Sequence, residues 1–258
     1  MFHMRSAMTK AIEKNNIDEV KKLIAKHAGN ADFLNAVDKT GKTALLKALF
    51  CGHLEIAVFL LSCPGIDVNK DVWLEIKNGN RYRCNPLGLA LRNYYNDIVN
   101  LLVEKRDTNV NWYAYECLTM LQIAVISGQH DNVNKLLLRS DLNLEWLDTL
   151  SNNAFTWAHK NLSRASFNTL ITQAGVSLHC HGRNPIDGFT YSISYDLIDT
   201  LKCLLTLHDF DVNKRLWSGD TILTLAVRQK DPDLLESVLA RPGLHVNSDA
   251  MHAILNQR

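Results

Sequence analysis

Residues 38–69 read DKTGKTALLKALFCGHLEIAVFLLSCPGIDVN, and this stretch contains one complete structural unit. Two short apolar segments, at about 43–51 and 54–62, flank a turn at Gly52, which predicts a pair of short helices. The chain then passes through a turn-rich segment to Asn69. Because related phrases recur along the sequence, the pair of helices with its following excursion is the repeating element of the protein.

The closing asparagine recurs with a regular period. Asn35 and Asn69 are separated by one period, about 34 residues, a length typical of repeat proteins. Asn111 follows Asn69 by one period plus an insertion of eight residues. Asn213 follows Asn111 by three periods, with Glu145 at the first intermediate position. The remaining members of the column, meaning the residues at one equivalent position in successive units, are His179 and Asn247.

A second column consists of residues that cap helices. Its members are Thr43, Asn85, Thr119, Asn153, Asp187 and Thr221. Each has a side-chain oxygen that can accept a hydrogen bond from the free N–H groups of a helix's first turn. A third column is small, as close helix packing requires: Ala48, Ala90, Ala124, Ala158, Ser192 and Ala226.

The cap column also decides how Gly41-Lys42-Thr43 is interpreted. These residues match the end of a phosphate-binding P-loop, but that loop needs a glycine where this chain has Ala36. No β-branched run precedes Gly41 to supply the buried strand of such a site. We therefore interpret the triplet as a turn glycine, an exposed lysine and a helix cap, and predict that nucleotides do not bind.

The units resemble the ankyrin-repeat family. Residues 38–69 and residues 218–247, SGDTILTLAVRQKDPDLLESVLARPGLHVN, match its G-x-T-x-L-x-x-A, G-H-x-x-I and D-V-N elements. The resemblance implies an all-α ankyrin-repeat solenoid of helix-turn-helix units joined by hairpin-like fingers. The chain departs from the family in one column, because no unit has the histidine of the T-P-L-H element: the residues there are Leu46, Gly88, Gln122, Thr156, Thr190 and Thr224.

The resemblance spans the chain, so we expect one domain over residues 1–258. It would comprise an N-terminal half-repeat at 1–36, six repeats at about 37–247 and a short capping helix at 248–258. The fifth and sixth units are irregular, with Leu162 and Asp196 where Gly52 and Gly128 mark the helix turn elsewhere. A single cooperative stack with softer middle repeats is the expected behaviour.

The eight-residue insertion predicts a longer hairpin at 71–84. Apolar and polar residues alternate on both sides of Asn78-Gly79, which is a strong hairpin signal. The insertion carries Trp73, Arg81, Tyr82 and Arg83. It can be a tolerated surface loop or a binding element, and the residue types leave both interpretations open.

Composition excludes several classes of function. A net charge of +1 lacks the basic excess of a general nucleic-acid binder, and no apolar run is long enough for a membrane span. The first residues lack the apolar core of a signal peptide, and the six cysteines lack metal or disulfide spacing, so we expect a cytoplasmic protein with reduced thiols. Neither His179-Cys180-His181 nor the Cys51 and His53 pair completes a metal or catalytic set. We expect no cofactor, no metal and no enzymatic activity.

A partner-binding role follows from the resemblance, which places partners on a concave surface of fingers and first helices. Carried over residue by residue, that surface comprises Lys39, Lys42, Phe50, Lys70, Arg92, Asn93, Trp112, Tyr115, Glu116, Trp146, Lys160, Arg183, Lys214, Trp217 and Arg228. The hairpin adds Trp73, Arg81, Tyr82 and Arg83. Trp112 and Trp146 lie one period apart in one column and are either binding anchors or packing residues beneath the fingers.

We therefore expect a monomeric protein–protein interaction module for an acidic or aromatic partner surface or peptide. The alternative is an enzyme, or a regulator of one, in which the 71–84 hairpin is an active-site element. Irregular repeats that fill the whole chain also look like the ankyrin-type effectors that intracellular bacteria deliver into host cells, which would place the protein in the host cytoplasm.

Overall fold

The computed structural model describes residues 2–27, 30–75, 81–114, 117–150, 152–161, 163–172, 198–206, 210–215 and 220–246. The chain divides into two compact units, Met1–Thr149 and Leu150–Arg258. Each unit is described by itself below. The expectation of a single domain over the whole chain stays a prediction.

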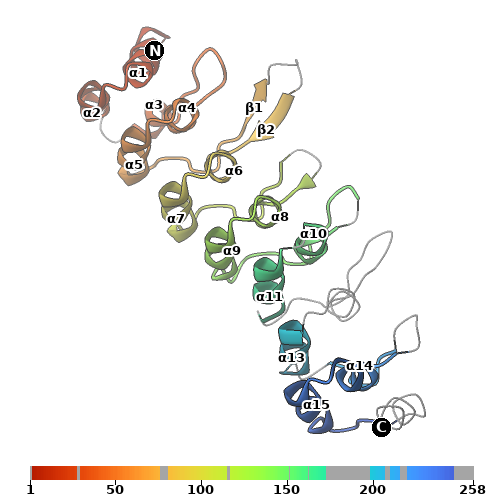
Figure 1. The fold of residues 1–258 in the computed structure, drawn as a ribbon. Helices are drawn as coiled ribbons and strands as arrows, with labels where there is room; N and C mark the ends of the chain where they lie inside the picture. The colour runs from red at the N-terminus through yellow and green to blue at the C-terminus, as the bar shows by residue number, and fades with distance from the viewer. Residues whose placement is uncertain are drawn as a thin grey trace. The chain divides into compact units, whose positions relative to one another are not determined.

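The first unit consists of helix pairs arranged in two rows (Figure 1). Its first helices are α1 (Phe2–Glu13), α4 (Ala44–Cys51), α6 (Pro86–Arg92) and α8 (Met120–Ile126), each packed against the next. Its second helices are α2 (Ile17–Lys26), α5 (Leu54–Ser62), α7 (Asn96–Glu104) and α9 (His130–Leu137), which form a parallel row. Between the pairs lie the short α3 (Ala31–Leu34) and the strands β1 (Val72–Glu75) and β2 (Arg81–Cys84).

The first 36 residues hold α1 and α2 packed on each other, and α1 continues the row of first helices onto α4. The assignment of residues 1–36 as a half-repeat stays a prediction.

The second unit repeats the pattern over the residues that are described. Helix α10 (Ala154–Lys160) packs on α11 (Arg164–Thr172), and α14 (Ile222–Gln229) packs on α15 (Pro232–Leu239). Helix α13 (Ile198–Thr206) lies between α11 and α15 and contacts both. The expected capping helix at 248–258 lies outside the described residues.

The columns found in the sequence form the core. The small residues Ala48, Ala90, Ala124, Ala158 and Ala226 are each at most 1% exposed, so nothing larger would fit where the first helices meet. Large apolar side chains three positions earlier, such as Leu45 and Phe155, are equally buried. Each helix pair therefore covers its neighbour's apolar face, which is how repeat proteins build a continuous core from short helices.

The cap column is confirmed at every described member. Thr43 accepts a hydrogen bond from the Leu46 N–H, Asn85 from Gly88 and Asn153 from Thr156. The same bond forms at Thr119 and Thr221. Asp187 lies outside the described residues. The triplet 41–43 thus leads into α4, with Thr43 as the cap residue and Gly41 in the left-handed region at φ 80°.

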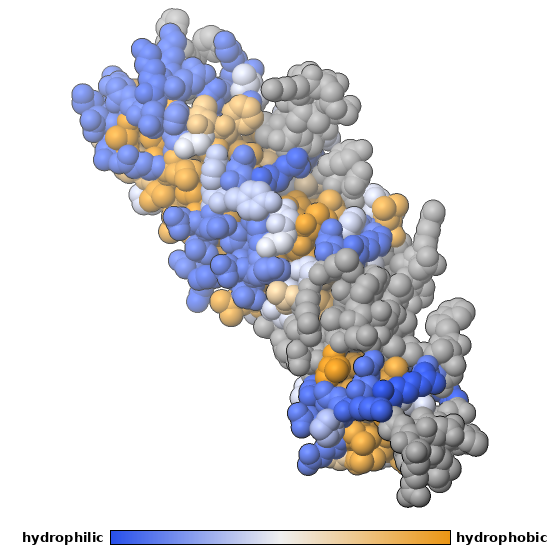
Figure 2. Space-filling model, viewed as in Figure 1, coloured by the Kyte–Doolittle hydropathy of each residue, from blue (hydrophilic) through white to orange (hydrophobic). Residues whose placement is uncertain are grey.

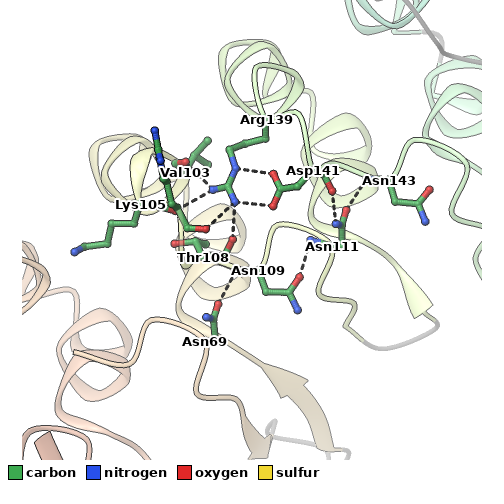
Figure 3. Close-up of polar contacts among 10 residues, drawn as sticks. Asn69, Val103, Lys105, Thr108, Asn109, Asn111, Arg139, Asp141 and Asn143 are labelled. Carbon is green, nitrogen blue, oxygen red and sulfur yellow. Dashed lines mark hydrogen bonds and ion pairs between the residues drawn. The ribbon is translucent and has the colours of Figure 1, made fainter. Parts of the chain in front are cut away.

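The asparagines of this column form a ladder of hydrogen bonds between successive repeats (Figure 3). The Asn69 amide donates to the Asp107 carbonyl at 2.6 Å and accepts from the Asn109 N–H at 2.7 Å. Asn111 makes the same pair of bonds one repeat later: it donates to the Asp141 carbonyl and accepts from the Asn143 N–H. The corresponding bonds of the remaining described members are Asn35 to residues 65 and 67, and Asn213 to residues 243 and 245. The asparagine amide has a donor and an acceptor at the end of one short side chain, so it can make both bonds from this position.

Arg139 anchors the end of α9 to the preceding unit (Figure 3). Its guanidinium group donates to the carbonyls of Val103, Lys105 and Thr108 and forms a bidentate ion pair with Asp141. These carbonyls lie at the end of α7 and just beyond it, where a helix leaves acceptors without intrahelical partners. The bonds from Arg139 also hold the pKa of the Asp141 carboxyl group below its ordinary value.

The turn between paired helices requires left-handed backbone. Gly52 adopts φ 74° at the end of α4, and glycine accepts this conformation without a Cβ penalty. In the equivalent turns Tyr94 has φ 58° and Lys230 has φ 55°. Two units therefore adopt the turn in spite of an unfavourable side chain.

Candidate partner-binding surface

The last turn of the first helices presents one column of side chains in the first unit. Phe50 of α4 is 54% exposed, Arg92 of α6 is exposed and Ile126 of α8 is half-buried. The Lys42 ammonium group lies 4.9 Å from the centroid of the Phe50 ring, within cation–π range. A finger residue and the helix that follows it therefore meet at this column.

The second unit has related contacts at equivalent positions. Lys160 donates to the Asn152 side chain at 2.8 Å, and Arg228 forms an ion pair with Asp220 at 2.9 Å. In each case the helix residue lies eight positions after its finger partner, as Phe50 does after Lys42. The end of the first helix and the finger before it form one surface within each unit.

Charge is divided between the two rows of helices. Helices α4, α6 and α8 contain no acidic residue, and their charged residues are Lys47 and Arg92. Helices α5, α7 and α9 contain four acidic residues and one lysine. The exposed Lys39 and Lys70 lie in the fingers before α4 and α6. Over three consecutive pairs the finger side is therefore the more positive one.

The insertion forms the expected hairpin. Strands β1 and β2 are antiparallel, with Val72 opposite Cys84 and Trp73 opposite Arg83. Trp73 is 61% exposed, whereas Val72 and Cys84 are buried, so one face of the hairpin base packs on the core. Burial raises the pKa of the Cys84 thiol to about 12. The exposed ring of Trp73 is available to a partner, and the register makes Arg83, not Tyr82, its cross-strand neighbour.

Arg83 is already occupied within the hairpin. Its guanidinium group forms an ion pair with Asp71, and its Nε donates to the same carboxylate at 2.6 Å. The pair fixes the start of the hairpin next to Trp73. Arg83 therefore orients the hairpin, and its charge is largely balanced there.

Trp112 and Trp146 both pack against neighbouring fingers and helices. A Cβ atom added at Gly88 would lie 3.4 Å from the ring of Trp112, so the glycine makes room for that indole. Trp146 stacks on Tyr113 with ring centroids 5.1 Å apart, and its indole N–H donates to the Cys117 carbonyl at 2.9 Å. Both indoles are half-buried. These contacts favour the packing interpretation, and the binding hot spot predicted there is untested.

The residues that stand in place of the family's histidine differ from repeat to repeat, and they form different hydrogen bonds. Gln122 accepts from the Thr119 N–H and donates to the Trp146 carbonyl of the next finger, which joins the cap to the neighbouring unit. Thr224 closes a reciprocal capping box with Thr221. Each of these bonds depends on a partner residue, Thr119, Trp146 or Thr221, and the residue type in the column does not by itself identify that partner.

The remaining predicted residues are placed as follows. Lys214 is half-buried and, like Lys160 and Arg228, belongs to the second unit. Arg81 and Tyr82 lie on β2, and Asn93 ends α6. Tyr115, Glu116, Arg183 and Trp217 lie outside the described residues, as does His179-Cys180-His181.

Two features of the surface were not anticipated. Tyr113 is 39% exposed at the edge of its finger, whereas the preceding residue, Trp112, was the one predicted to bind a partner. Asp38 accepts hydrogen bonds from the Thr40 hydroxyl group and from the N–H groups of Thr40 and Lys42. Burial acts to raise the pKa of Asp38, but these hydrogen bonds outweigh it and lower the pKa. An acidic residue thus shapes the finger that displays Lys39.

The described residues contain no group of three or more His, Cys, Asp or Glu side chains arranged to hold a metal ion. None of the described helices has both the length and the apolar character needed to cross a membrane. In the view of Figure 2, hydrophobic areas alternate with hydrophilic ones over the described surface.

Comparisons with known proteins agree with this architecture. Residues 3–72 match the family model described as ankyrin repeats (3 copies). The crystal structure of an ankyrin repeat domain from Acinetobacter baumannii AYE superposes with a TM-score of 0.59 at 19% identity, covering 77% of this chain and 96% of that one. A search of curated proteins finds no match. Residues 3–72 therefore carry ankyrin repeats, and the chain has the all-α ankyrin-repeat fold that it shares with the Acinetobacter domain.

Proposed function

We propose that the protein is a non-catalytic module that binds a partner protein through the fingers and first helices of residues 36–126. Ankyrin repeats generally act as protein–protein interaction modules, which supports the general class. The finer assignment, to this surface and to an acidic or aromatic partner, rests on the chemistry described above.

The observation that carries the proposal is the exposure of two aromatic rings on the positive side of the first unit. Phe50 is 54% exposed and Trp73 is 61% exposed. Neither ring is needed to fill the core, and large aromatic side chains are the most frequent anchors of protein interfaces. The Lys42 ammonium group lies 4.9 Å from the centroid of the Phe50 ring, and Lys39 and Arg92 are exposed on the same fingers and first helices. Positive charge on this side accelerates encounter with an acidic partner.

Proximity labelling with the full chain tests the surface directly. Partners captured by the wild type should be lost from the double variant Phe50→Ala/Trp73→Ala. The matched control is Leu138→Ala, which removes a 78% exposed apolar side chain at the end of α9, away from the fingers. Capture that survives the double variant but fails in the control would assign binding to the second helices instead.

The delivery of this module into host cells is a separate part of the proposal. It is supported by the irregular units that occupy the chain, as in ankyrin-type effectors of intracellular bacteria. A translocation reporter fused to the full chain should give signal in the host cytoplasm when the producing bacterium infects a cell. A reporter that stays in the bacterium would contradict delivery and leave the binding proposal unaffected.

A further inference from the structure

We propose that the first unit recognises an extended acidic segment of its partner, with apolar residues three positions before and three positions after a central Asp or Glu. This inference rests on the proposed binding function and specifies the chemistry of the ligand. It follows from the column Phe50, Arg92 and Ile126, which alternates apolar, cationic and apolar side chains across three adjacent helices.

The spacing of the helices sets the spacing of the motif. Helices α4, α6 and α8 pack side by side in sequence, and neighbouring packed helices lie about 10 Å apart. An extended chain advances about 3.3 Å per residue, so a segment crossing the helices moves from one column residue to the next in about three residues. Every third side chain of such a segment therefore meets the column.

The three column positions differ in the side chain that they favour. Phe50 offers an aromatic ring of which 54% is exposed, with the Lys42 ammonium group held nearby. Arg92 is exposed and its guanidinium group has five N–H donors, so it can bind a carboxylate through two of them and keep its contacts within the protein. Ile126 offers a partly exposed aliphatic chain. A ligand that complements all three is apolar, acidic and apolar in order.

Charge complementarity selects an acidic ligand over a basic one. Helices α4, α6 and α8 have no acidic side chain to receive a lysine or arginine, and the neighbouring fingers add Lys39 and Lys70. The acidic residues of these fingers, Asp38, Asp67 and Asp71, already accept hydrogen bonds or pair with Arg83 within the protein. A basic segment would meet like charges along its path, and like-charge juxtaposition suppresses binding of the wrong partner.

Selection from a random phage-displayed dodecapeptide library, with the full chain as bait, tests the motif. Wild type should enrich apolar–x–x–acidic–x–x–apolar sequences. Arg92→Glu should shift the central residue to Lys or Arg and keep the flanking spacing. The control Lys135→Glu makes the same change of charge on second helix α9 and should enrich the wild-type motif.

Fluorescence anisotropy with one enriched peptide then measures each contact. Phe50→Ala should weaken binding by about tenfold, and replacing the central acid by Lys should weaken it by at least about tenfold. Arg92→Glu should reverse the preference between the acidic and the lysine peptide. Phe50 and Arg92 are exposed, and a melting curve confirms that both variants fold.

Three outcomes would overturn the inference: no enriched sequence, a consensus without a central acid or with another spacing, or an Arg92→Glu bait that selects the wild-type motif. If capture of partner proteins still depends on Phe50 and Trp73 in any of these cases, the proposed function stands and the motif alone is wrong. If capture is also independent of both residues, both proposals fail.

Discussion

Two adjacent residues, Lys42 and Thr43, show how burial separates a structural side chain from a surface one. Thr43 is 1% exposed and caps α4, whereas Lys42 reaches out to the Thr40 hydroxyl group and the Phe50 ring. A phosphate-binding lysine would instead need a nest of inward N–H groups around it. Thr43 therefore caps the helix, and Lys42 presents its ammonium group at the surface.

Thr43→Ala should destabilise the protein by about 1 kcal/mol through loss of the cap, while Lys42→Ala should leave the free energy of unfolding nearly unchanged. Urea titration followed by circular dichroism measures both. Calorimetry with ATP should show no binding to either protein, and micromolar binding that Lys42→Ala abolishes would restore the P-loop interpretation.

Tyr94→Gly should stabilise the protein by about 1 kcal/mol, because Tyr94 holds φ 58° at the turn position where Gly52 and Gly128 stand. The ring is 59% exposed, so little packing is lost. Asn93→Gly in the same turn is the control, since Asn93 has φ −101° and gains nothing from glycine. A melting temperature that falls in the Tyr94 variant would show that the ring packs more than its exposure suggests.

At the scale of elements, the asparagine ladder joins each finger base to the next unit. Asn111→Ala removes two hydrogen bonds, to the Asp141 carbonyl and from the Asn143 N–H, and should cost about 2 kcal/mol. Asn134 is exposed on α9, so Asn134→Ala is the control and should change the free energy of unfolding little. Equal effects of the two substitutions in urea titrations would mean that water replaces the ladder bonds.

The 71–84 hairpin divides into a packed base and a removable end. Deleting residues 75–82 restores the regular repeat period and keeps the buried Val72 and Cys84. Shortening a surface loop changes closure entropy only slightly, so the melting temperature should shift by a few degrees at most. Loss of the helical circular dichroism signal in the deletion variant would place the hairpin end in the core.

The elements predictable from the sequence are those whose residues act through local chemistry. The cap at Thr43, the hairpin around Asn78-Gly79 and the small Ala48 column each follow from a residue type at a fixed position. The roles of Trp112 and Trp146 could not be predicted, because whether an indole is exposed depends on Gly88 and Cys117, which come from other fingers and helices.

At the scale of the whole molecule, carboxyl groups with lowered pKa are spread over both units. Hydrogen bonds from Lys47 lower the pKa of Glu13, and the Leu234 N–H and Lys202 lower that of Asp231. Asp38 and Asp141 are lowered as well. The folded state therefore binds protons more weakly than the unfolded chain at these groups.

Stability should consequently fall in acid. A group whose folded pKa lies below its unfolded value of about 4 contributes fully above that value and loses its contribution as pH falls through the folded pKa. The melting temperature should be nearly constant between about pH 7 and pH 5 and decline below about pH 4. The double variant Asp38→Asn/Asp141→Asn should show a shallower decline, and a melting temperature that rises on acidification would contradict the assignment.

The asparagine ladder also has a discontinuity in the sequence. Glu145 occupies the column after Asn111, close to the boundary between the two compact units at Thr149 and Leu150. A carboxylate accepts hydrogen bonds but has no N–H to donate, so it cannot reproduce the paired bond of an asparagine amide.

The exposed indole of Trp73 can serve as an intrinsic fluorescence probe of binding. The other described tryptophans, Trp112, Trp146 and Trp157, are half-buried, so dissolved iodide should quench the emission of Trp73 in preference to theirs. A ligand that covers the hairpin would shield that ring from iodide and shift its emission to shorter wavelength. Binding at the fingers could thus be followed by intrinsic tryptophan fluorescence, without a label attached to either molecule.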